Sequence, residues 1–333
     1  MNRIASRIGA ALTTAALFIS VPSIGWALDI ALTNDDGWDA IGIQAVKRAL
    51  VYAGHTVTLA GPLNQQSGSS AAINETELVI RKEYGIDHEG ALEYSVALAP
   101  PDGPENVEPT ESAEPATSAL VAIDIARERS GRLPDLLVSG TNDGANLGSI
   151  TQPSSTVGAA IVAMGSSFNG SVPAIAISTD PICVAGEGCD TLNELHFARV
   201  ADFLVGLIDH LQTKPGILRT EVGLLPPGIG LNINYPPVEV PNGVVVARQG
   251  RTAPIDGLPV TYTIGCFDSC LDLKPGDWQI GGIKDIAPDS TPELRNADTE
   301  AYAQGYIAIV PIVADFTIDA YKRYESVFRT LKY

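Results

Sequence analysis

The sequence predicts an α/β fold with three layers around a mostly parallel sheet, and three observations support it. Residues 28–33 form a short apolar run that ends in a polar turn, which is typical of a buried strand. Ile43, Val46 and Leu50 then recur at helical spacing. Strand-like and helix-like segments keep alternating to residue 178, and crossovers of this kind build a parallel sheet with helices on both faces.

The predicted elements follow one another without an internal repeat. The first helix spans residues 40–53, and Gly54 after it is expected to adopt a left-handed cap conformation. The later elements are a strand at 55–60, a helix at 118–130, a strand at 135–139, a helix at 156–164 and a strand at 172–178.

Two stretches interrupt this alternation. Residues 99–115 are rich in Pro and acidic side chains, so we expect an exposed loop or a partly disordered insertion. The pattern of residues 236–298 predicts a β-rich extension, and the tail at 316–333 is long enough for a helix that packs on the core or on a neighbouring subunit. We therefore expect one domain at 28–333, with a core at 28–235 and the extension and tail at 236–333.

Residues 1–27 have the layout of a secretory signal peptide. Arg3 and Arg7 precede an apolar run, and a small-residue cleavage site ends at Ala27. The run is marginal in length for a membrane span, so an uncleaved anchor is the weaker alternative. We expect cleavage after Ala27, export to the periplasm or the medium, and no membrane segment in the mature chain.

The chain is strongly acidic. Its 333 residues include 21 Lys and Arg against 39 Asp and Glu, which gives a formal net charge of −18. Proteins bind nucleic-acid duplexes through cations that release counterions from the phosphates, and this chain has few to offer. DNA and RNA duplexes are therefore excluded as partners.

The four cysteines form two close pairs. An oxidising compartment favours disulfides within such pairs. Zinc binding is the alternative, but neither pair has the two-residue spacing of a zinc knuckle and no His lies nearby. We predict the disulfides Cys183–Cys189 and Cys266–Cys270, each at the tip of a loop.

Catalytic chemistry is expected where loops leave the carboxyl ends of the parallel strands. Asp35 and Asp36 follow the first strand directly. Adjacent carboxylates after a buried strand need charge compensation, and hard divalent cations such as Mg²⁺, Mn²⁺ and Ca²⁺ prefer oxygen ligands. The alternative is a plain turn in which one Asp caps the following helix. The sequence alone leaves both interpretations open.

Two further polar loops lie at the same edge of the predicted sheet. Residues 64–70 supply hydroxyl and amide oxygens, and residues 139–148 lead to a helix start at Ser154 and Thr156 that suits an anion. Each loop has an ordinary structural interpretation, as a polar surface loop and as a helix cap with Gly-rich turns. Together with the Asp pair they suit metal-assisted phosphoryl hydrolysis, in which the cation polarises the phosphoryl oxygen and activates water.

Other hydrolytic chemistries fit the sequence less well. It contains neither a G-x-S-x-G nucleophile elbow nor a G-x-x-x-x-G-K-[ST] phosphate loop. His55, His88, His196 and His210 lie outside the three polar loops, so we expect surface or packing roles for them. A Ser–His hydrolase would therefore lack its base.

Several segments resemble the SurE family of metal-dependent survival-protein nucleotidases. The combination of TNDDG after the first strand with SG-x-N-x-G-x-NLG downstream is highly specific. The matching segments are TNDDGWDAIGIQAV (33–46), GHTVTLAGPLNQQSGSS (54–70), SGTNDGANLG (139–148), STVGAAIVA (155–163), PAIAIS (173–178), LLPPGIGLNINYPP (224–237), VARQGR (246–251) and DTEAYAQGYIAIVPI (298–312).

This resemblance implies a fold, an activity and a set of site residues. It implies a Rossmann-like core whose C-terminal region is exchanged to form a homodimer or homotetramer, and hydrolysis of nucleoside 5′- or 3′-monophosphates with one divalent cation. We expect Mg²⁺ or Mn²⁺, with Ca²⁺ as the alternative. The residues that match the family's metal ligands are Asp35, Asp36, Ser67 and Asn142. Asn146, Ser154 and Thr156 fall where the family gathers its phosphate site.

The chain departs from the family pattern beside the phosphate site. Pro153 and Ser155 stand where the family usually has Tyr and Gly, and Ser155 adds a side chain where backbone approaches phosphate. If Asp143 faces the site, its charge strengthens metal binding and opposes an anionic substrate. Two alternatives therefore stay open: a broad acid phosphatase or polyphosphate hydrolase, and a secreted metal- or ligand-binding module without turnover.

The mechanism expected from this site uses metal-bound water. Asp35 or Asp36 orients or deprotonates the water that attacks the phosphorus in line, and the sequence does not choose between them.

Overall fold

The computed structural model describes residues 25–83, 91–100, 109–165, 170–214, 216, 224–226, 228–252, 260–264, 280–285 and 292–315. The signal segment to residue 24, the Cys266–Cys270 pair, His88 and the tail from residue 316 lie outside these residues. None of the helices within the described ranges combines the length and apolarity that a membrane crossing requires.

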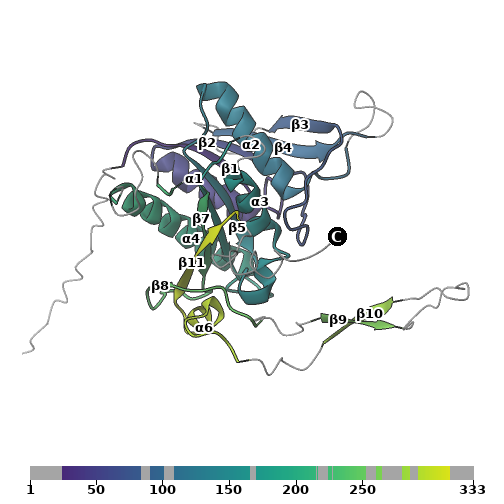
Figure 1. The fold of residues 1–333 in the computed structure, drawn as a ribbon, viewed down its shortest axis with the longest axis vertical. Helices are drawn as coiled ribbons and strands as arrows, with labels where there is room; N and C mark the ends of the chain where they lie inside the picture. Colours follow the sequence, from purple (N-terminus) through teal and green to yellow (C-terminus); the bar gives the residue numbers. More distant parts are fainter. Residues whose placement is uncertain are drawn as a thin grey trace, which may run out of the picture.

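A nine-stranded sheet in the order β3-β4-β2-β1-β5-β6-β7-β11-β8 forms the centre of the molecule (Figure 1). Neighbouring strands from β4 to β7 are all parallel, whereas β3 and β11 run antiparallel to β4 and β7. This confirms the predicted mostly parallel sheet. The strands are β1 (Asp29–Thr33), β2 (Thr56–Pro62), β3 (Leu78–Glu83), β4 (Ala91–Leu98), β5 (Leu136–Asp143), β6 (Ala174–Thr179), β7 (Ile229–Tyr235), β8 (Val244–Val246) and β11 (Ile307–Val313).

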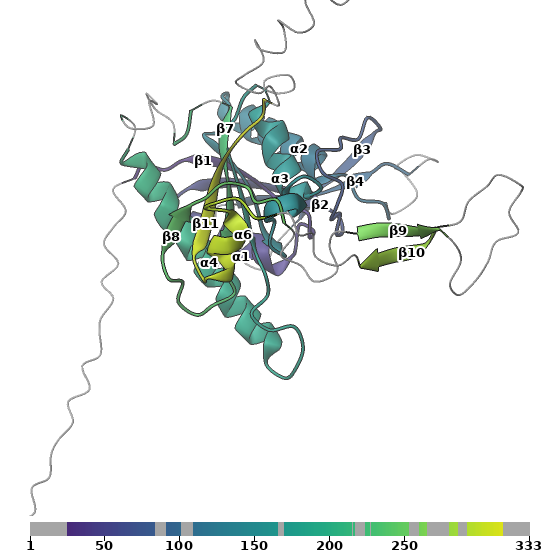
Figure 2. The same cartoon turned by 60° about the horizontal axis from the view of Figure 1, so that its bottom comes forward.

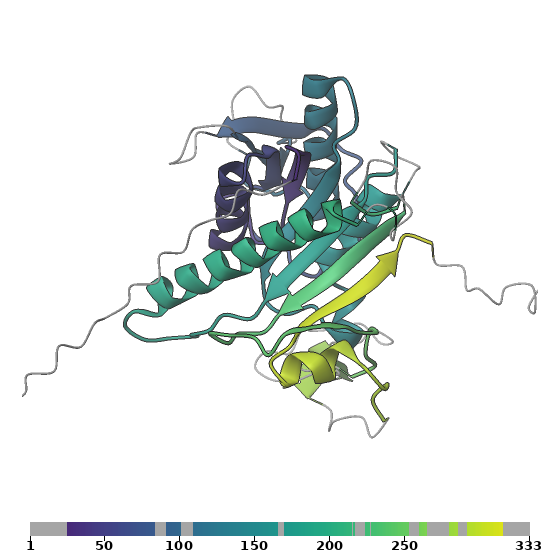
Figure 3. The ribbon, with the colours of Figure 1, turned by 90° about the vertical axis from the view of Figure 1, so that its left-hand side faces the viewer.

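Helices cover both faces of this sheet, so the predicted three layers are confirmed. α1 (Ile41–Tyr52) packs on α4 (Cys189–Gln212) over one face, and α2 (Pro115–Ser130) packs on α3 (Ser155–Met164) over the other. Figure 3 shows α4 lying across one face of the sheet. Each helix layer shares a separate cluster of buried apolar side chains with the sheet, and burial of this apolar surface is the main stabilising contribution.

Local signals set the ends of the helices. α1 ends in a Schellman motif, because His55 N donates to Leu50 O and Gly54 N to Val51 O, with Gly54 at φ +91°. The predicted glycine cap is thus confirmed. α2 begins three residues earlier than predicted, because Pro115 occupies its first turn, where the missing N–H costs nothing.

The segment between β2 and α2 differs from its prediction. No element was expected at residues 71–98, but β3 and β4 pair there as an antiparallel hairpin. The end of the Pro-rich insertion is also not an exposed loop: Ala113 is fully buried and its N–H donates to Val96 O. The acidic composition did not predict this contact, because the backbone N–H and carbonyl groups form hydrogen bonds whatever side chains the segment carries.

The C-terminal extension contributes to the main sheet and also leaves it. β8 and β11 join the sheet, and α6 (Asp298–Ala303) packs beside β11. β9 (Val260–Ile264) and β10 (Ile280–Asp285) form a separate two-stranded antiparallel sheet that projects from the main body (Figures 1 and 2).

The structure places a disulfide between Cys183 and Cys189, in the turn before α4. The side chain of Asn193 braces the same turn by bonding to both the N–H and the carbonyl of Cys183.

Candidate active site

The loop after β1 presents Asp35 and Asp36 at the carboxyl edge of the sheet. Asn34 Nδ2 closes this loop by donating to Gly37 O at 2.8 Å. The N-cap position of α1 is Ala40, which makes no side-chain capping bond. Neither Asp therefore serves as a helix cap, and the capping interpretation of this dipeptide is wrong.

Asp35 lies at the meeting point of all three predicted loops. Its carbonyl accepts from Gln66 N at 2.7 Å, and its Oδ1 accepts from Thr156 Oγ1 at 2.8 Å. Burial, with 3% of the residue exposed, raises the pKa of its carboxyl to about 6, although the bonds from Thr156 act in the opposite direction. The side chain is thus held at the N-terminus of α3, where backbone N–H groups favour an anion.

Asp36 is held by the third loop. Its Oδ2 accepts from Asp143 N at 2.9 Å. Burial and then the neighbouring charge of Asp35 raise the pKa of Asp36 to about 7. Two partly desolvated carboxylates that resist simultaneous ionisation are an arrangement that a divalent cation stabilises.

Ser67 is exposed at the tip of the second loop, beside the Asp pair. Gln65 links the two, because its amide Nε2 donates to Ser67 Oγ at 3.4 Å and its side chain also hydrogen-bonds to Asp36. The Ser67 hydroxyl is thus connected to Asp36 through Gln65, and it has no strong protein partner among its described contacts.

Asn142 is buried at the end of β5 and has a fixed orientation. Its Nδ2 donates to Gly144 O at 2.5 Å, which leaves Oδ1 as the side-chain atom able to ligate a cation. Its neighbour Asp143 is the residue that bonds to Asp36, so Asn142 is tied to the Asp pair through the adjacent peptide. Asp143 itself is an exposed residue, but its carboxyl is partly desolvated, and this desolvation and then the charge of Asp180 raise its pKa.

The donor set of two carboxylates, a hydroxyl and an amide carbonyl fits a hard cation such as Mg²⁺ or Mn²⁺. It does not fit zinc, which prefers His and Cys ligands. Among the described residues, no group of three or more His, Cys, Asp and Glu side chains is placed to hold a metal ion. The oxygen site contains two such side chains, Asp35 and Asp36, and the assignment of its four ligands stays a prediction.

The three predicted phosphate residues also meet at this site, but two of them have their polar groups engaged. Thr156 Oγ1 donates to Asp35 and accepts from Asn146 Nδ2 at 3.3 Å. The second hydrogen of Asn146 Nδ2 goes to Ser178 Oγ at 2.8 Å. Asn146 and Thr156 thus position Asp35, whereas Ser154 caps α3 through Oγ and keeps its hydroxyl hydrogen for an acceptor.

Further residues that the sequence did not single out hold the loop around Asn146. The buried Asn232 and Asn234 of β7 both donate from Nδ2 to Asn146 O, at 2.9 and 3.1 Å, and Asn234 Oδ1 accepts from Asn146 N at 2.7 Å. A signal was present in the sequence, because Asn at alternate positions of an apolar strand predicts a polar partner on one face.

Asp180 braces the same loop from the other side. Its Oδ1 accepts from Ala145 N at 2.8 Å, and its Oδ2 accepts from the hydroxyl of Tyr302 at 2.7 Å. Burial and the Asp180 charge raise the pKa of Tyr302, so the hydroxyl stays protonated and donates.

Of the described histidines, His55 and His196 have packing roles, and His210 of α4 is exposed. His55 Nδ1 accepts from Leu28 N at 3.2 Å at the start of β2, and the fully buried His196 lies 2.7 Å from Thr179 Oγ1. Because the Thr179 hydroxyl donates to Tyr235 O, His196 Nε2 is the donor to Thr179. Burial lowers the pKa of both histidines and keeps them neutral. Neither bonds to the Asp pair.

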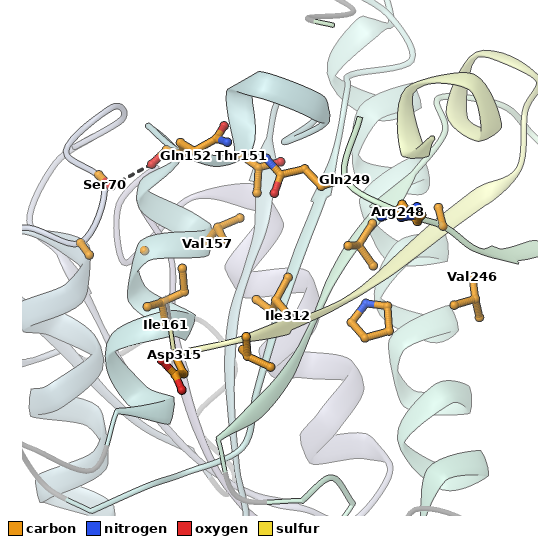
Figure 4. A pocket seen from close by; sticks show the side chains of 16 residues that line it. Ser70, Thr151, Gln152, Val157, Ile161, Val246, Arg248, Gln249, Ile312 and Asp315 are labelled. Carbon is orange, nitrogen blue, oxygen red and sulfur yellow. Dashed lines mark hydrogen bonds between the residues drawn. The ribbon is translucent and has the colours of Figure 1, made fainter. Parts of the chain in front are cut away.

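A groove of about 880 Å³ lies beside the site, between α3 and β11 (Figure 4). Its wall is mostly apolar, with Val157, Ile161 and Ile312 at its centre, and Gln152, Arg248 and Gln249 near one end. None of the four predicted metal ligands lines it, so this groove is distinct from the oxygen site.

The chain thus has an α/β fold with oxygen-bearing side chains gathered at the carboxyl edge of its parallel strands. The family model for survival protein SurE matches residues 30–255. The chain therefore belongs to the SurE family, as its motifs indicate.

Similar proteins cover nearly all of this chain. The 5′-nucleotidase SurE of Rubrobacter xylanophilus is 33% identical over 290 residues, which cover 86% of this chain and 92% of that protein. The 5′-nucleotidase SurE of Nitratidesulfovibrio vulgaris strain DP4 is 28% identical over 291 residues, covering 86% and 94%. The crystal structure of the SurE protein from Aquifex aeolicus shares the fold, with a TM-score of 0.60 at 24% identity over 90% of this chain and 98% of that one.

Proposed function

We propose that this protein is a divalent-metal-dependent phosphatase that hydrolyses nucleoside 5′- or 3′-monophosphates to nucleoside and phosphate. One observation carries the proposal: two adjacent, largely desolvated carboxylates, Asp35 and Asp36, lie at the carboxyl edge of the parallel strands, and the loops that carry Ser67 and Asn142 hydrogen-bond to these two residues. The 5′-nucleotidase names of the similar proteins support the substrate class.

Asp35, Asp36, Ser67 and Asn142 would hold one Mg²⁺ or Mn²⁺ ion. A cation bound there supplies a polarised phosphoryl oxygen and an acidified water molecule. The remaining steps belong to the protein. Thr156 fixes one oxygen of Asp35 and Asp143 N–H fixes one oxygen of Asp36, so each carboxylate keeps its other oxygen for the cation or for the proton of the attacking water.

The phosphoryl group is proposed to bind at the start of α3. The hydroxyl of Ser154 and the first N–H groups of the helix can donate to its oxygens. Asn146 and Thr156 act one step further away by holding Asp35, so their substitution should reduce catalysis through the orientation of that carboxylate.

We also propose that the protein is exported, cleaved after Ala27 and assembled as a homodimer or homotetramer. The disulfide between Cys183 and Cys189 supports an oxidising compartment. N-terminal sequencing of the protein from a periplasmic fraction, and light scattering of that material, test the two parts separately.

The function is tested by phosphate release from nucleoside 5′- and 3′-monophosphates, polyphosphate and an aryl phosphate, with Mg²⁺, Mn²⁺ or EDTA. Asp35→Asn should lower the metal-dependent rate by about 100-fold or more, because it removes a ligand and a charge from the transition-state environment. Asp124→Asn is the matched control, since Asp124 lies on α2 in an exposed pair with Arg127.

The outcome separates the proposed function from its alternatives. Release from monophosphates that stops with EDTA and in Asp35→Asn supports the proposal. Preference for polyphosphate or the aryl phosphate indicates the broad phosphatase instead. Mn²⁺ binding without release from any of these compounds contradicts an enzyme and indicates a binding module.

A further inference from the structure

The hydroxyl of Ser155 hydrogen-bonds to the loop that carries Ser67. We propose that Ser155 is a positioning residue for the metal site. Ser155 is the first residue of α3 and is fully buried. The inference rests on the proposed function in one respect, since it takes Ser67 as a ligand of the cation. The family pattern has Gly at this position, so the hydrogen bonds of the Ser155 hydroxyl are a feature of this chain.

The hydroxyl group of Ser155 both donates and accepts a hydrogen bond with the backbone of this loop. Ser155 Oγ donates to Gln66 O at 2.9 Å and accepts from Ser69 N at 2.8 Å. Ser69 Oγ lies 3.1 Å from the same atom. The Ser69 hydroxyl can direct its own hydrogen either to Ser155 Oγ or to Gln66 O, which lies 3.4 Å from Ser69 Oγ. One buried oxygen thus binds the loop on both sides of Ser67.

Gln66 and Ser69 are the first and fourth residues of a tight turn. Gly68 in its third position has φ +86°, which is typical of a type II β-turn. Ser67 occupies the second position, where its side chain is exposed. Ser155 therefore fixes the backbone of the turn from the inside while the Ser67 hydroxyl remains accessible to a ligand.

Other contacts hold the rest of the loop without the Ser155 hydroxyl. Gln66 N donates to Asp35 O at 2.7 Å, and Ser70 Oγ donates to Gln152 O at 2.9 Å (Figure 4). The loop backbone also lies directly on α3, because a Cβ atom on Gly158 would stand 2.0 Å from Ser70 O. Loss of the Ser155 hydroxyl should therefore loosen the turn around Ser67 and leave both ends of the loop in place.

Ser155 in place of the usual Gly is also one of the departures of this chain from the family pattern. An added side chain at this position was expected to intrude where a backbone approaches phosphate. The structure directs the Ser155 hydroxyl toward residues 66–69 instead, so its effect should appear in metal affinity.

The test compares Ser155→Ala with Ser171→Ala in the full chain. Ser171 offers a matched control at the other end of α3, because its Oγ also makes two backbone bonds, donating to Met164 O and accepting from Gly228 N. Ser67→Ala serves as the reference for complete loss of the hydroxyl ligand. The measurements are the dissociation constant for Mn²⁺ by calorimetry, the melting temperature with and without Mn²⁺, and the Mn²⁺ concentration that gives half-maximal phosphate release.

We expect Ser155→Ala to raise the dissociation constant for Mn²⁺ by about 3- to 10-fold, which corresponds to the loss of one buried hydrogen-bonding group. The half-saturating Mn²⁺ concentration should rise by the same factor, while the rate at saturating Mn²⁺ stays within about twofold of the wild type. Ser171→Ala should lower the melting temperature without changing the affinity for Mn²⁺.

Unchanged Mn²⁺ affinity in Ser155→Ala would overturn the inference, as would an equal loss in Ser171→Ala, which would indicate a general structural effect. These results differ from a failure of the proposed function. A wild-type protein that binds Mn²⁺ and releases no phosphate contradicts the enzyme, and the affinity comparison still decides the role of Ser155.

Discussion

Asp36 shows at the scale of one residue how the site conflicts with stability. Its pKa of about 7 lies well above the ordinary value of 3.8, because burial and then the charge of Asp35 disfavour the ionised form. Between these two pH values the folded state holds a proton that the unfolded state releases. The metal-free protein therefore loses stability as the pH rises from about 4 to about 7.

We predict that Asp36→Asn stabilises the metal-free protein at pH 8, because it removes a buried charge without changing the side-chain shape. The melting temperature in EDTA should rise by on the order of 2 °C or more, and the gain should vanish near pH 4, where the Asp is protonated. Thermal denaturation of both proteins across this pH range is the measurement. Asp124→Asn is the control, and a variant less stable than the wild type at pH 8 contradicts the prediction.

At the scale of elements, carboxylates on one segment hold the backbone of another. Asp298, fully buried at the start of α6, accepts from Gly250 N and Thr299 N at 2.8 Å each and from Gly148 N at 3.2 Å. It thereby joins α6, the loop after β8 and the short 3₁₀ helix η1 (Gly148–Thr151), which follows the Asn146 loop.

We predict that Asp298→Ala destabilises the protein by about 1–3 kcal/mol, because it leaves buried N–H groups without acceptors. Denaturant unfolding measures the loss, and hydrogen exchange should become faster at Gly148 and Gly250. Asp190→Ala is the matched control, since Asp190 also lies in the first turn of a helix but is exposed. Equal losses of unfolding free energy in the two variants would contradict a stabilising role for the hydrogen bonds of Asp298.

A buried ion pair connects α1 to β4. Lys47 Nζ lies 2.7 Å from Glu93 Oε1, and both side chains are 3% exposed. Removal of one partner leaves an uncompensated charge in the interior, so Lys47→Met should cost about 3–5 kcal/mol. The double variant Lys47→Met/Glu93→Leu should be more stable than Lys47→Met alone, and a further loss in its denaturant unfolding curve would disprove this account.

At the scale of the whole molecule, the acidic excess should oppose compactness. A formal net charge of −18 repels itself within one folded chain, and salt screens this repulsion. We predict that the melting temperature in EDTA rises when NaCl is increased from about 0.01 M to about 0.3 M, over which the Debye length falls severalfold. A melting temperature that falls with NaCl would instead show that attractive ion pairs dominate.

The sequence predicted those parts of the molecule whose signals are local. Alternating strand and helix patterns gave the parallel sheet and its two helix layers, and Gly54 marked the end of α1. The hairpin of β3 and β4 was missed because its burial does not follow an apolar alternation: Glu93 and Ser95 of β4 are buried although polar, whereas the apolar Ile80 of β3 is exposed at 44%.

By itself, the sequence determined the fold class, the family and the kinds of side chain at the site, because these depend on periodicity and on short motifs such as Asn34–Gly37. Only the tertiary structure decided that Ser155 hydrogen-bonds to the Ser67 loop, Asn234 to Asn146, and Asp298 to Gly148. Each of these contacts joins residues more than 80 positions apart. Their hydrogen bonds depend on how whole elements pack, which no local pattern encodes.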